Sequence, residues 1–256
     1  MLDNLHDTAR LALACLDLTS LNDNDDARTI DVLCARASSP HGAVAAVCVW
    51  PRFVAQARAA LPANVRVAAV ANFPQGALDD RLALADADAI ATAGGNEIDL
   101  VLPWRAWAAG QRVACAALVA AVRRAHPALT LKLILETGEL RDHGWIASAS
   151  TMALDEGVDF LKTSTGKTPV SATPAAARTM LAAIAAHPRR HQAGFKASGG
   201  IRSVADAKLY IDLTRQTLGA VTPQNFRLGA SALMTDILAV LSGAASSAGP
   251  LPGTAY

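Results

Sequence analysis

Short apolar runs bounded by turn residues recur along this chain roughly every 30 residues, and longer amphipathic stretches separate them. This spacing is typical of one strand followed by one helix. Eight such units in 256 residues match the size of a (β/α)8 barrel, in which a ring of parallel strands lies inside a ring of helices. We therefore predict the α/β class and a single (β/α)8 (TIM) barrel.

The expected elements alternate along the whole chain. The strands are expected at Leu13–Leu18, Val44–Trp50, Val65–Asn72, Glu97–Leu102, Thr130–Glu136, Asp159–Thr163, Gly194–Ala197 and Phe226–Gly229. The helices are expected at Asp25–Arg36, Arg52–Ala60, Leu78–Ala93, Trp104–His126, Asp142–Asp155, Pro174–His187, Val204–Leu218 and Ala232–Leu241. Residues 1–241 are expected to form one catalytic domain, and the small, aperiodic residues 242–256 a flexible C-terminal tail.

Composition excludes several classes of protein. The net charge is +1 and 52% of the residues are hydrophobic, which argues against nucleic-acid binding and against disorder. No apolar run reaches the ~18 residues of a membrane-spanning helix, so no membrane partner is expected. The acidic N-terminus lacks the basic region of a signal peptide, and the four cysteines form no Cys-x-x-Cys pair. These features favour the cytoplasm.

Three lysines stand in successive predicted strands, the fifth, sixth and seventh: Lys132, Lys162 and Lys196. A single such lysine is usually a solvated strand end, but three in a row make that interpretation poor. Apolar neighbours and nearby cations push a lysine toward its neutral form, which is the form that Schiff-base chemistry requires. The pattern therefore indicates a nucleophilic amine at the mouth of the barrel.

Acidic residues occupy other strand ends, at Asp17, Asp99 and Glu136. A buried carboxylate has to be paired or hydrogen-bonded. These acids could simply neutralise the lysines, or one of them could also relay protons. The residues alone leave both roles open.

Glycine-rich loops follow the last three predicted strands, at Gly166-Lys167-Thr168, Gly199-Gly200 and Gly229-Ala230-Ser231. Barrels often bind phosphate with such loops and the helix N-termini behind them. Gly166-Lys167-Thr168 is not a nucleotide-binding P-loop, because Leu161 occupies the position of its first glycine. None of the six histidines falls at a predicted strand end, so no metal is expected.

These segments resemble the deoxyribose-phosphate aldolase family over nearly the whole chain. The matching motifs are Leu16–Asp23, Val47–Phe53, Asn72–Gly76, Glu97–Val101, Leu131–Leu140, Phe160–Lys167 and Gly194–Arg202. The resemblance implies a class I aldolase on a (β/α)8 barrel that needs no cofactor. Such an enzyme interconverts 2-deoxy-D-ribose 5-phosphate with acetaldehyde and D-glyceraldehyde 3-phosphate, a reaction of deoxyribose catabolism.

The resemblance also assigns roles to individual residues. It implies that Lys162 forms the Schiff base, that Lys196 lowers its pKa, and that Asp99 transfers protons. The terminal Tyr256 would assist proton transfer at the enamine carbon. The substrate would contact Asp17, Thr19, Asn22, Cys48, Lys132 and Thr165. The phosphate would be held by Gly166, Lys167, Gly199, Gly200, Gly229 and Ser231.

Some positions depart from the family pattern. Ala197-Ser198 replaces the common Pro-Ala, Ala232 stands where a second serine is common, and Trp50 replaces a smaller aromatic residue. Two alternatives remain: a related Schiff-base aldolase with another phosphorylated substrate, and a catalytically silent sugar-phosphate-binding protein. The resemblance implies a monomer or a homodimer.

Overall fold

Eight parallel strands close into a barrel in a computed structural model that describes residues 4–244. The ring order is β1-β10-β9-β8-β7-β6-β5-β4, and β1 pairs with both β10 and β4. The strands are β1 (Leu16–Thr19), β4 (Ala46–Val49), β5 (Arg66–Ala71), β6 (Glu97–Val101), β7 (Thr130–Ile134), β8 (Phe160–Lys162), β9 (Gly194–Ser198) and β10 (Phe226–Ala230). The predicted (β/α)8 barrel is confirmed.

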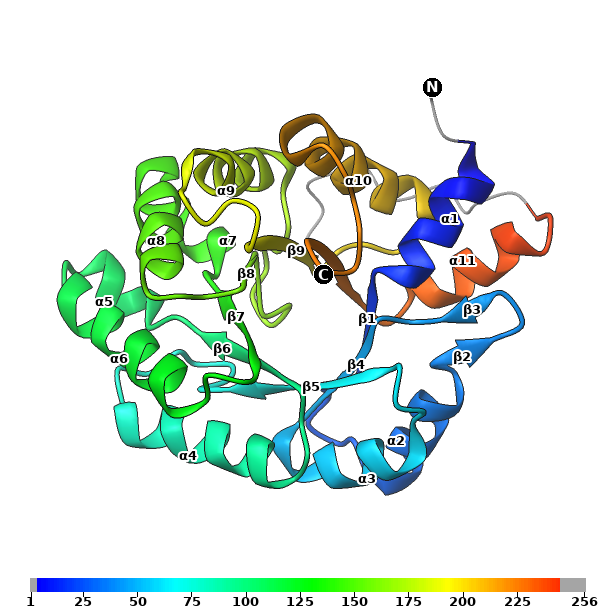
Figure 1. Cartoon of the computed structure of the whole chain (residues 1–256), viewed down its shortest axis with the longest axis horizontal. Helices are drawn as coiled ribbons and strands as arrows, with labels where there is room; N and C mark the ends of the chain where they lie inside the picture. Colours follow the sequence, from blue (N-terminus) through cyan, green and yellow to red (C-terminus); the bar gives the residue numbers. More distant parts are fainter. Residues whose placement is uncertain (1–3, 245–256) are drawn as a thin grey trace.

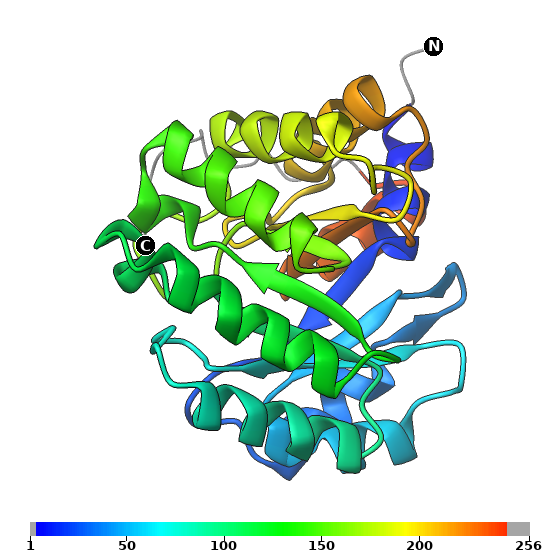
Figure 2. The same ribbon diagram turned by 60° about the vertical axis from the view of Figure 1, so that its left-hand side comes forward.

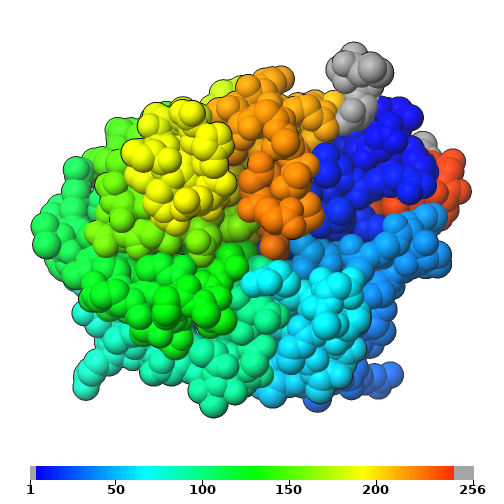
Figure 3. Space-filling view, viewed as in Figure 1, coloured from blue at the N-terminus to red at the C-terminus, as the bar shows by residue number. Residues whose placement is uncertain are grey.

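Helices surround this ring on the outside, as Figures 1 and 2 show. They are α1 (Leu5–Ala14), α2 (Ala27–Ala35), α3 (Val54–Ala60), α4 (Asp80–Thr92), α5 (Trp104–Ala108), α6 (Arg112–Ala125), α7 (Thr137–Leu140), α8 (His143–Asp155), α9 (Pro174–Ala186), α10 (Val204–Leu218) and α11 (Leu233–Leu241). Their apolar faces pack on the outward-facing residues of the strands in one continuous hydrophobic core. In the space-filling view, helices and loops form a continuous packed surface across this face of the molecule (Figure 3).

Residues at the helix ends explain why several helices begin and end where they do. The Ser203 hydroxyl accepts a hydrogen bond from the Asp206 backbone N–H, and the Asp206 carboxylate accepts one from the Ser203 backbone N–H, which forms a capping box. Thr173 caps α9 ahead of Pro174 in the first turn. Gly94 follows α4 with a φ of 83°, the left-handed conformation expected after a helix.

The structure corrects the sequence-based boundaries in several places. The first predicted strand, Leu13–Leu18, begins too early, because Leu13 and Ala14 complete the unpredicted helix α1. The predicted helix Trp104–His126 is two helices, since the chain turns at Gly110 with a φ of 85°. Three further elements were not predicted: α7 and the hairpin strands β2 (Ser38–Ser39) and β3 (Gly42–Ala43).

The C-terminal part is described only as far as residue 244. Helix α11 ends at Leu241, and most of the predicted tail, including Tyr256, lies outside the described residues. Among residues 4–244, no helix combines the length and apolarity needed to cross a bilayer.

Candidate active site

Asp99 on β6 gathers the three strand lysines inside the barrel. Its Oδ1 lies 2.7 Å from Lys132 Nζ on β7, and its Oδ2 lies 2.8 Å from both Lys162 Nζ on β8 and Lys196 Nζ on β9. Asp99, Lys132 and Lys196 are fully buried, and Lys162 is 2% exposed. The strand register sets this arrangement, because Asp99 is level with Lys132, and Lys162 is level with Lys196.

A second buried acid, Asp17 on β1, contacts two of these lysines, Lys196 and Lys132. Its Oδ2 lies 2.5 Å from Lys196 Nζ and 3.1 Å from Lys132 Nζ. Its Oδ1 accepts a hydrogen bond from Arg227 on β10 at 2.7 Å. Asp17 thus belongs to the charged cluster. It lies within β1 rather than at the end of the strand.

Two members of this charged cluster, Glu97 and Arg227, were not predicted from the sequence to be site residues. Glu97 Oε2 is 2.6 Å from Lys132 Nζ, and its Oε1 is 3.0 Å from a terminal nitrogen of Arg227 and 2.5 Å from Nε of the half-exposed Arg66. Glu97 stands two residues before Asp99, so both side chains face the barrel interior. That period-2 alternation is the signal that could have found it.

The charges in this buried cluster do not balance if every group is ionised. Three carboxylates, on Asp17, Glu97 and Asp99, face four cations, on Lys132, Lys162, Lys196 and Arg227. Lys162 is the least compensated cation, because its one carboxylate partner among residues 4–244, Asp99 Oδ2, also binds Lys196. The geometry therefore favours the neutral amine at Lys162.

The pKa directions agree with this charge count. Burial, reinforced by the positive charge of Lys196, holds the pKa of Lys162 below its ordinary value, although Asp99 opposes the shift. Burial also disfavours the charged form of Lys196, but Asp17 and Asp99 outweigh it and raise the Lys196 pKa. Two neighbouring lysines thus differ in the direction of their pKa shifts, as expected of a nucleophile beside a permanent cation.

Cys48 on β4 also faces this cluster, with its Sγ 3.9 Å from Asp99 Oδ2. Burial and the Asp99 charge raise the pKa of the thiol to about 11, so it stays protonated at neutral pH. Cys48 also packs in a small apolar cluster with Leu21, Ala68 and Val70. Trp50 and Phe73 pack against this cluster. This group makes the β4–β5 side of the interior apolar.

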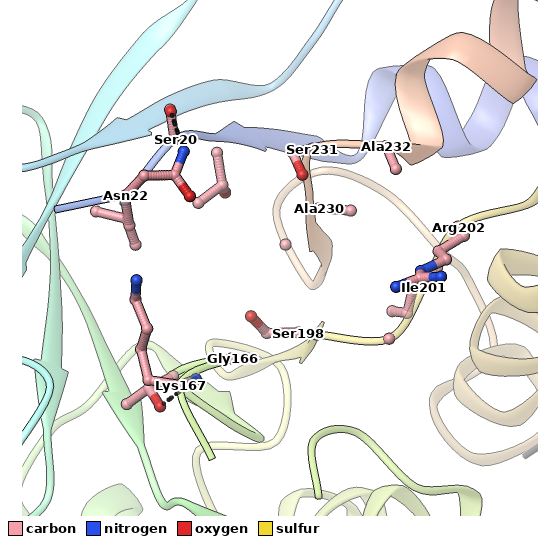
Figure 4. Close-up of a pocket in the computed structure, with 16 residues that line it drawn as sticks. Ser20, Asn22, Gly166, Lys167, Ser198, Ile201, Arg202, Ala230, Ser231 and Ala232 are labelled. Atoms are coloured by element: carbon pink, nitrogen blue, oxygen red, sulfur yellow. Dashed lines mark hydrogen bonds between the residues drawn. The ribbon is translucent and has the colours of Figure 1, made fainter. Parts of the chain in front are cut away.

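A cavity of about 450 Å³ lies at the carboxyl ends of β1, β8, β9 and β10. All six predicted phosphate residues line it, together with Thr19, Asn22 and Thr165. Figure 4 shows Lys167 extending from the β8 side toward Asn22, with Ser198 and Ser231 between them and Arg202. The cavity reaches the start of α11, where Ala232 lines it and no side chain caps the first backbone N–H groups, an arrangement that favours an anion.

Ser198 and Ala232, two positions that depart from the family pattern, also line the cavity. The Ser198 hydroxyl therefore faces the same space as the predicted phosphate residues. Trp50, the third departure, donates a hydrogen bond from Nε1 to the Asn22 backbone oxygen at 3.1 Å. The larger aromatic ring thus supports the loop that carries Asn22.

Glu136 differs from the other acids. The fifth strand ends at Ile134, and Glu136 follows it in the left-handed conformation. Its carboxylate hydrogen-bonds to Thr165 and Thr168 and forms no lysine salt bridge among the described residues. Of the strand-end acids, Asp17 and Asp99 pair with the lysines, which is one of the two roles left open by the sequence, whereas Glu136 pairs with none in the described residues.

Histidine, cysteine, aspartate and glutamate side chains form no cluster of metal-binding size within residues 4–244. The four cysteines are buried and unpaired.

Comparison with known proteins gives a consistent assignment. The family model described as DeoC/LacD family aldolase matches residues 11–233. A deoxyribose-phosphate aldolase from Agrobacterium fabrum is 47% identical over 242 residues, which is 93% of each chain.

Solved structures show the same fold. The barrel superposes on a deoxyribose phosphate aldolase from Aeropyrum pernix, described as tetrameric, with a TM-score of 0.73, 23% identity, and coverage of 94% and 93% of the two chains. A protein from Toxoplasma gondii, described as a candidate deoxyribose-phosphate aldolase, gives a TM-score of 0.85 at 23% identity and covers 93% of this chain and 95% of its own. With a family model that spans most of the sequence and a relative at 47% identity, this chain belongs to the DeoC/LacD family of aldolases.

Proposed function

We propose that this protein is a deoxyribose-phosphate aldolase that cleaves 2-deoxy-D-ribose 5-phosphate into acetaldehyde and D-glyceraldehyde 3-phosphate. One observation carries the proposal. Lys162 is a buried lysine with a lowered pKa, and it is level with Lys196 in the neighbouring strand. Lys196 stands two residues before Ser198, which lines the cavity. The cavity has the uncapped N-terminus of α11 and the glycine loops that suit the substrate phosphate.

The reaction would begin at the neutral amine of Lys162. Its Nζ attacks the C1 aldehyde of the open-chain sugar, and loss of water gives an iminium. Removal of the proton from the C3 hydroxyl then breaks the C2–C3 bond, whose electrons move into the iminium and leave an enamine. Glyceraldehyde 3-phosphate departs, C2 of the enamine takes up a proton, and water releases acetaldehyde and the free lysine.

The neighbouring residues take the proton and binding steps in this proposal. Asp99, which contacts both Lys162 and Lys196, would exchange protons with the bound carbonyl and hydroxyl groups through water. Lys132, Asp17 and Cys48 would border the reacting carbons, and Thr19, Asn22 and Thr165 would contact the sugar hydroxyls. Tyr256, outside the described residues, would relay the proton to the enamine carbon.

Replacing Gly200 with valine tests the phosphate site. Gly200 lines the cavity with a φ of 77°, and a Cβ there would meet no atom within 4 Å, so the new side chain would occupy the anion's space. We expect the KM for deoxyribose 5-phosphate to rise about tenfold or more, which is ~1.4 kcal/mol of binding. The KM for unphosphorylated deoxyribose should change much less.

Gly219→Val is the matched control for this variant. Gly219 has a φ of 85° and equally open surroundings, but it ends α10 and does not line the cavity. Its valine variant also places a β-branched side chain at a positive φ, without touching the proposed site. Equal losses for both substrates in Gly200→Val would mean misfolding rather than a blocked phosphate site.

Two assays separate this proposal from its alternatives. Incubation with acetaldehyde and borohydride, followed by mass spectrometry, reveals a reduced ethyl adduct on an aldolase but none on a silent binding protein. Cleavage of deoxyribose 5-phosphate distinguishes this activity from that of a related Schiff-base aldolase. Full activity in the presence of a chelator would support cofactor-free chemistry.

The proposal also includes the protein's setting. We place the enzyme in the cytoplasm, where its sugar-phosphate substrate would be found, and propose a monomer or a homodimer without nucleic-acid or membrane partners. The near-neutral charge of the chain supports the absence of a nucleic-acid partner in this proposal. Light scattering of the purified protein would measure the oligomeric state.

A further inference from the structure

Glu136 is a fully buried acid outside the lysine cluster, and its backbone is strained. Its φ of 54° and ψ of 57° place it in the left-handed region, which non-glycine residues rarely adopt. Such a conformation persists only where the surrounding structure holds it, and it is concentrated at functional sites. Here it turns the chain between β7 and α7.

The carboxylate of Glu136 is occupied entirely by the loop that follows β8. Oε1 accepts hydrogen bonds from Thr165 N at 3.2 Å and from Thr168 Oγ1 at 3.3 Å. Oε2 accepts one from Thr165 Oγ1 at 2.5 Å. Thr165 Oγ1 in turn accepts a hydrogen bond from Lys167 N at 3.0 Å. A single side chain therefore fixes the backbone of residues 165–168.

This loop forms one wall of the cavity. Thr165, Gly166 and Lys167 line the space, whereas Glu136 and Thr168 do not. In the part of the chain that the structure describes, Glu136 forms no salt bridge. Burial raises the pKa of its carboxyl group, although the hydrogen bonds from Thr165 and Thr168 and the charge of Lys162 oppose the shift. A buried acid without a salt bridge is costly to retain, so its hydrogen bonds to the loop have to offset much of that cost.

We propose that Glu136 is a positioning residue that sets the affinity for the substrate phosphate by holding the 165–168 loop against the cavity. The inference rests on the proposed function, since it assumes that this cavity takes the phosphate. Glu136 does not line the cavity and would not touch the substrate. It acts through the backbone and side chains of Thr165 and Lys167.

Glu136→Gln tests the proposal with little change in volume. The amide turns one of the two accepting oxygens into a donor, which then faces the N–H or hydroxyl groups of Thr165 and Thr168. We expect the KM for deoxyribose 5-phosphate to rise about tenfold, with kcat within about threefold of the original value. The KM for unphosphorylated deoxyribose should stay nearly constant, and the inhibition constant of inorganic phosphate should rise in parallel with the first KM.

Two further variants keep the test decisive. Thr168→Val removes a hydrogen bond to Glu136 from outside the cavity, so it should give the same selective loss in weaker form. Glu139→Gln removes an acidic charge from the same short helix and should leave both substrates unaffected. If Glu136→Gln fails to fold, Thr168→Val alone decides the question.

The outcomes distinguish a failure of the proposed function from a failure of the positioning role of Glu136. If the unmodified protein does not cleave deoxyribose 5-phosphate, the proposed function fails. If it cleaves the sugar phosphate but Glu136→Gln or Thr168→Val affects both substrates equally, or neither, the positioning role is overturned. A selective loss with a parallel change in phosphate inhibition supports it.

Discussion

Lys162→Arg is expected to abolish both Schiff-base formation and cleavage of deoxyribose 5-phosphate. Arginine keeps the positive charge and much of the length, but its guanidinium remains protonated and cannot attack a carbonyl. Loss of a covalent nucleophile typically lowers kcat by on the order of 10⁴–10⁶. After treatment with acetaldehyde and borohydride, the variant should show no increase in mass, while the unmodified protein carries one adduct on the peptide that contains Lys162.

The fold should survive this change, because Asp99 keeps its contacts to Lys132 and Lys196. Lys208→Arg serves as the control, since Lys208 lies on α10 and pairs only with the nearby Asp212 among the described residues. A borohydride-trapped label on Lys132 or Lys196 in the unmodified protein would reject Lys162 as the nucleophile.

Lys196→Leu is expected to move the rising limb of the pH profile of kcat/KM to higher pH. The Lys196 charge lowers the pKa of Lys162, whereas Asp99 raises it. Removing Lys196 leaves the opposing influence of Asp99 in place, so the pKa of Lys162 rises. Because each unit of increase lowers the neutral fraction of the amine about tenfold at a fixed pH below the pKa, activity near neutrality falls.

The total loss near neutral pH should be about 10²–10⁴-fold, because Lys196 also takes part in the proposed proton transfer. Activity should recover partly as the pH rises, which a purely structural defect would not produce. Asp17 keeps Lys132 and Arg227 as partners, so the thermal unfolding midpoint should show that the protein still folds. Lys208→Leu should leave the profile unchanged, and an unshifted limb in Lys196→Leu would refute the like-charge mechanism.

The barrel could be predicted from the sequence because its units repeat at a regular interval and its strands are buried on both sides. The helix α1 and the break at Gly110 could not. The run from Leu13 to Leu18 is apolar throughout, and such a run fits a strand as well as the end of a buried helix. Gly110 lies within a sequence whose helical periodicity continues on both sides, so the turn left little trace in the pattern.

The chemistry of the site was visible where a charged residue interrupts an apolar strand, as at Asp99 and Lys162. The sequence also identified many of the residues that line the cavity, because glycine loops follow three successive predicted strands, a joint placement typical of phosphate sites in barrels. The partners of each acid were not predictable, since they depend on strand register. The pairing of Glu97 with Arg227 on β10, and of Glu136 with a loop rather than a lysine, became evident only in three dimensions.

The pairing of Asp17 with Arg227 also bears on when the active site comes into being during synthesis. The two residues are 210 positions apart, on the first and last strands of the ring, and β1 has β10 as one of its two neighbours. Contacts between such distant segments form late, because a long loop has to close first. A nascent chain in which β10 is still inside the ribosome lacks Arg227 from the charged cluster and lacks one wall of the cavity. Lys162, the proposed nucleophile, therefore acquires its final environment only after β10 has joined the ring, and a chain cut short before Phe226 should not trap an aldehyde.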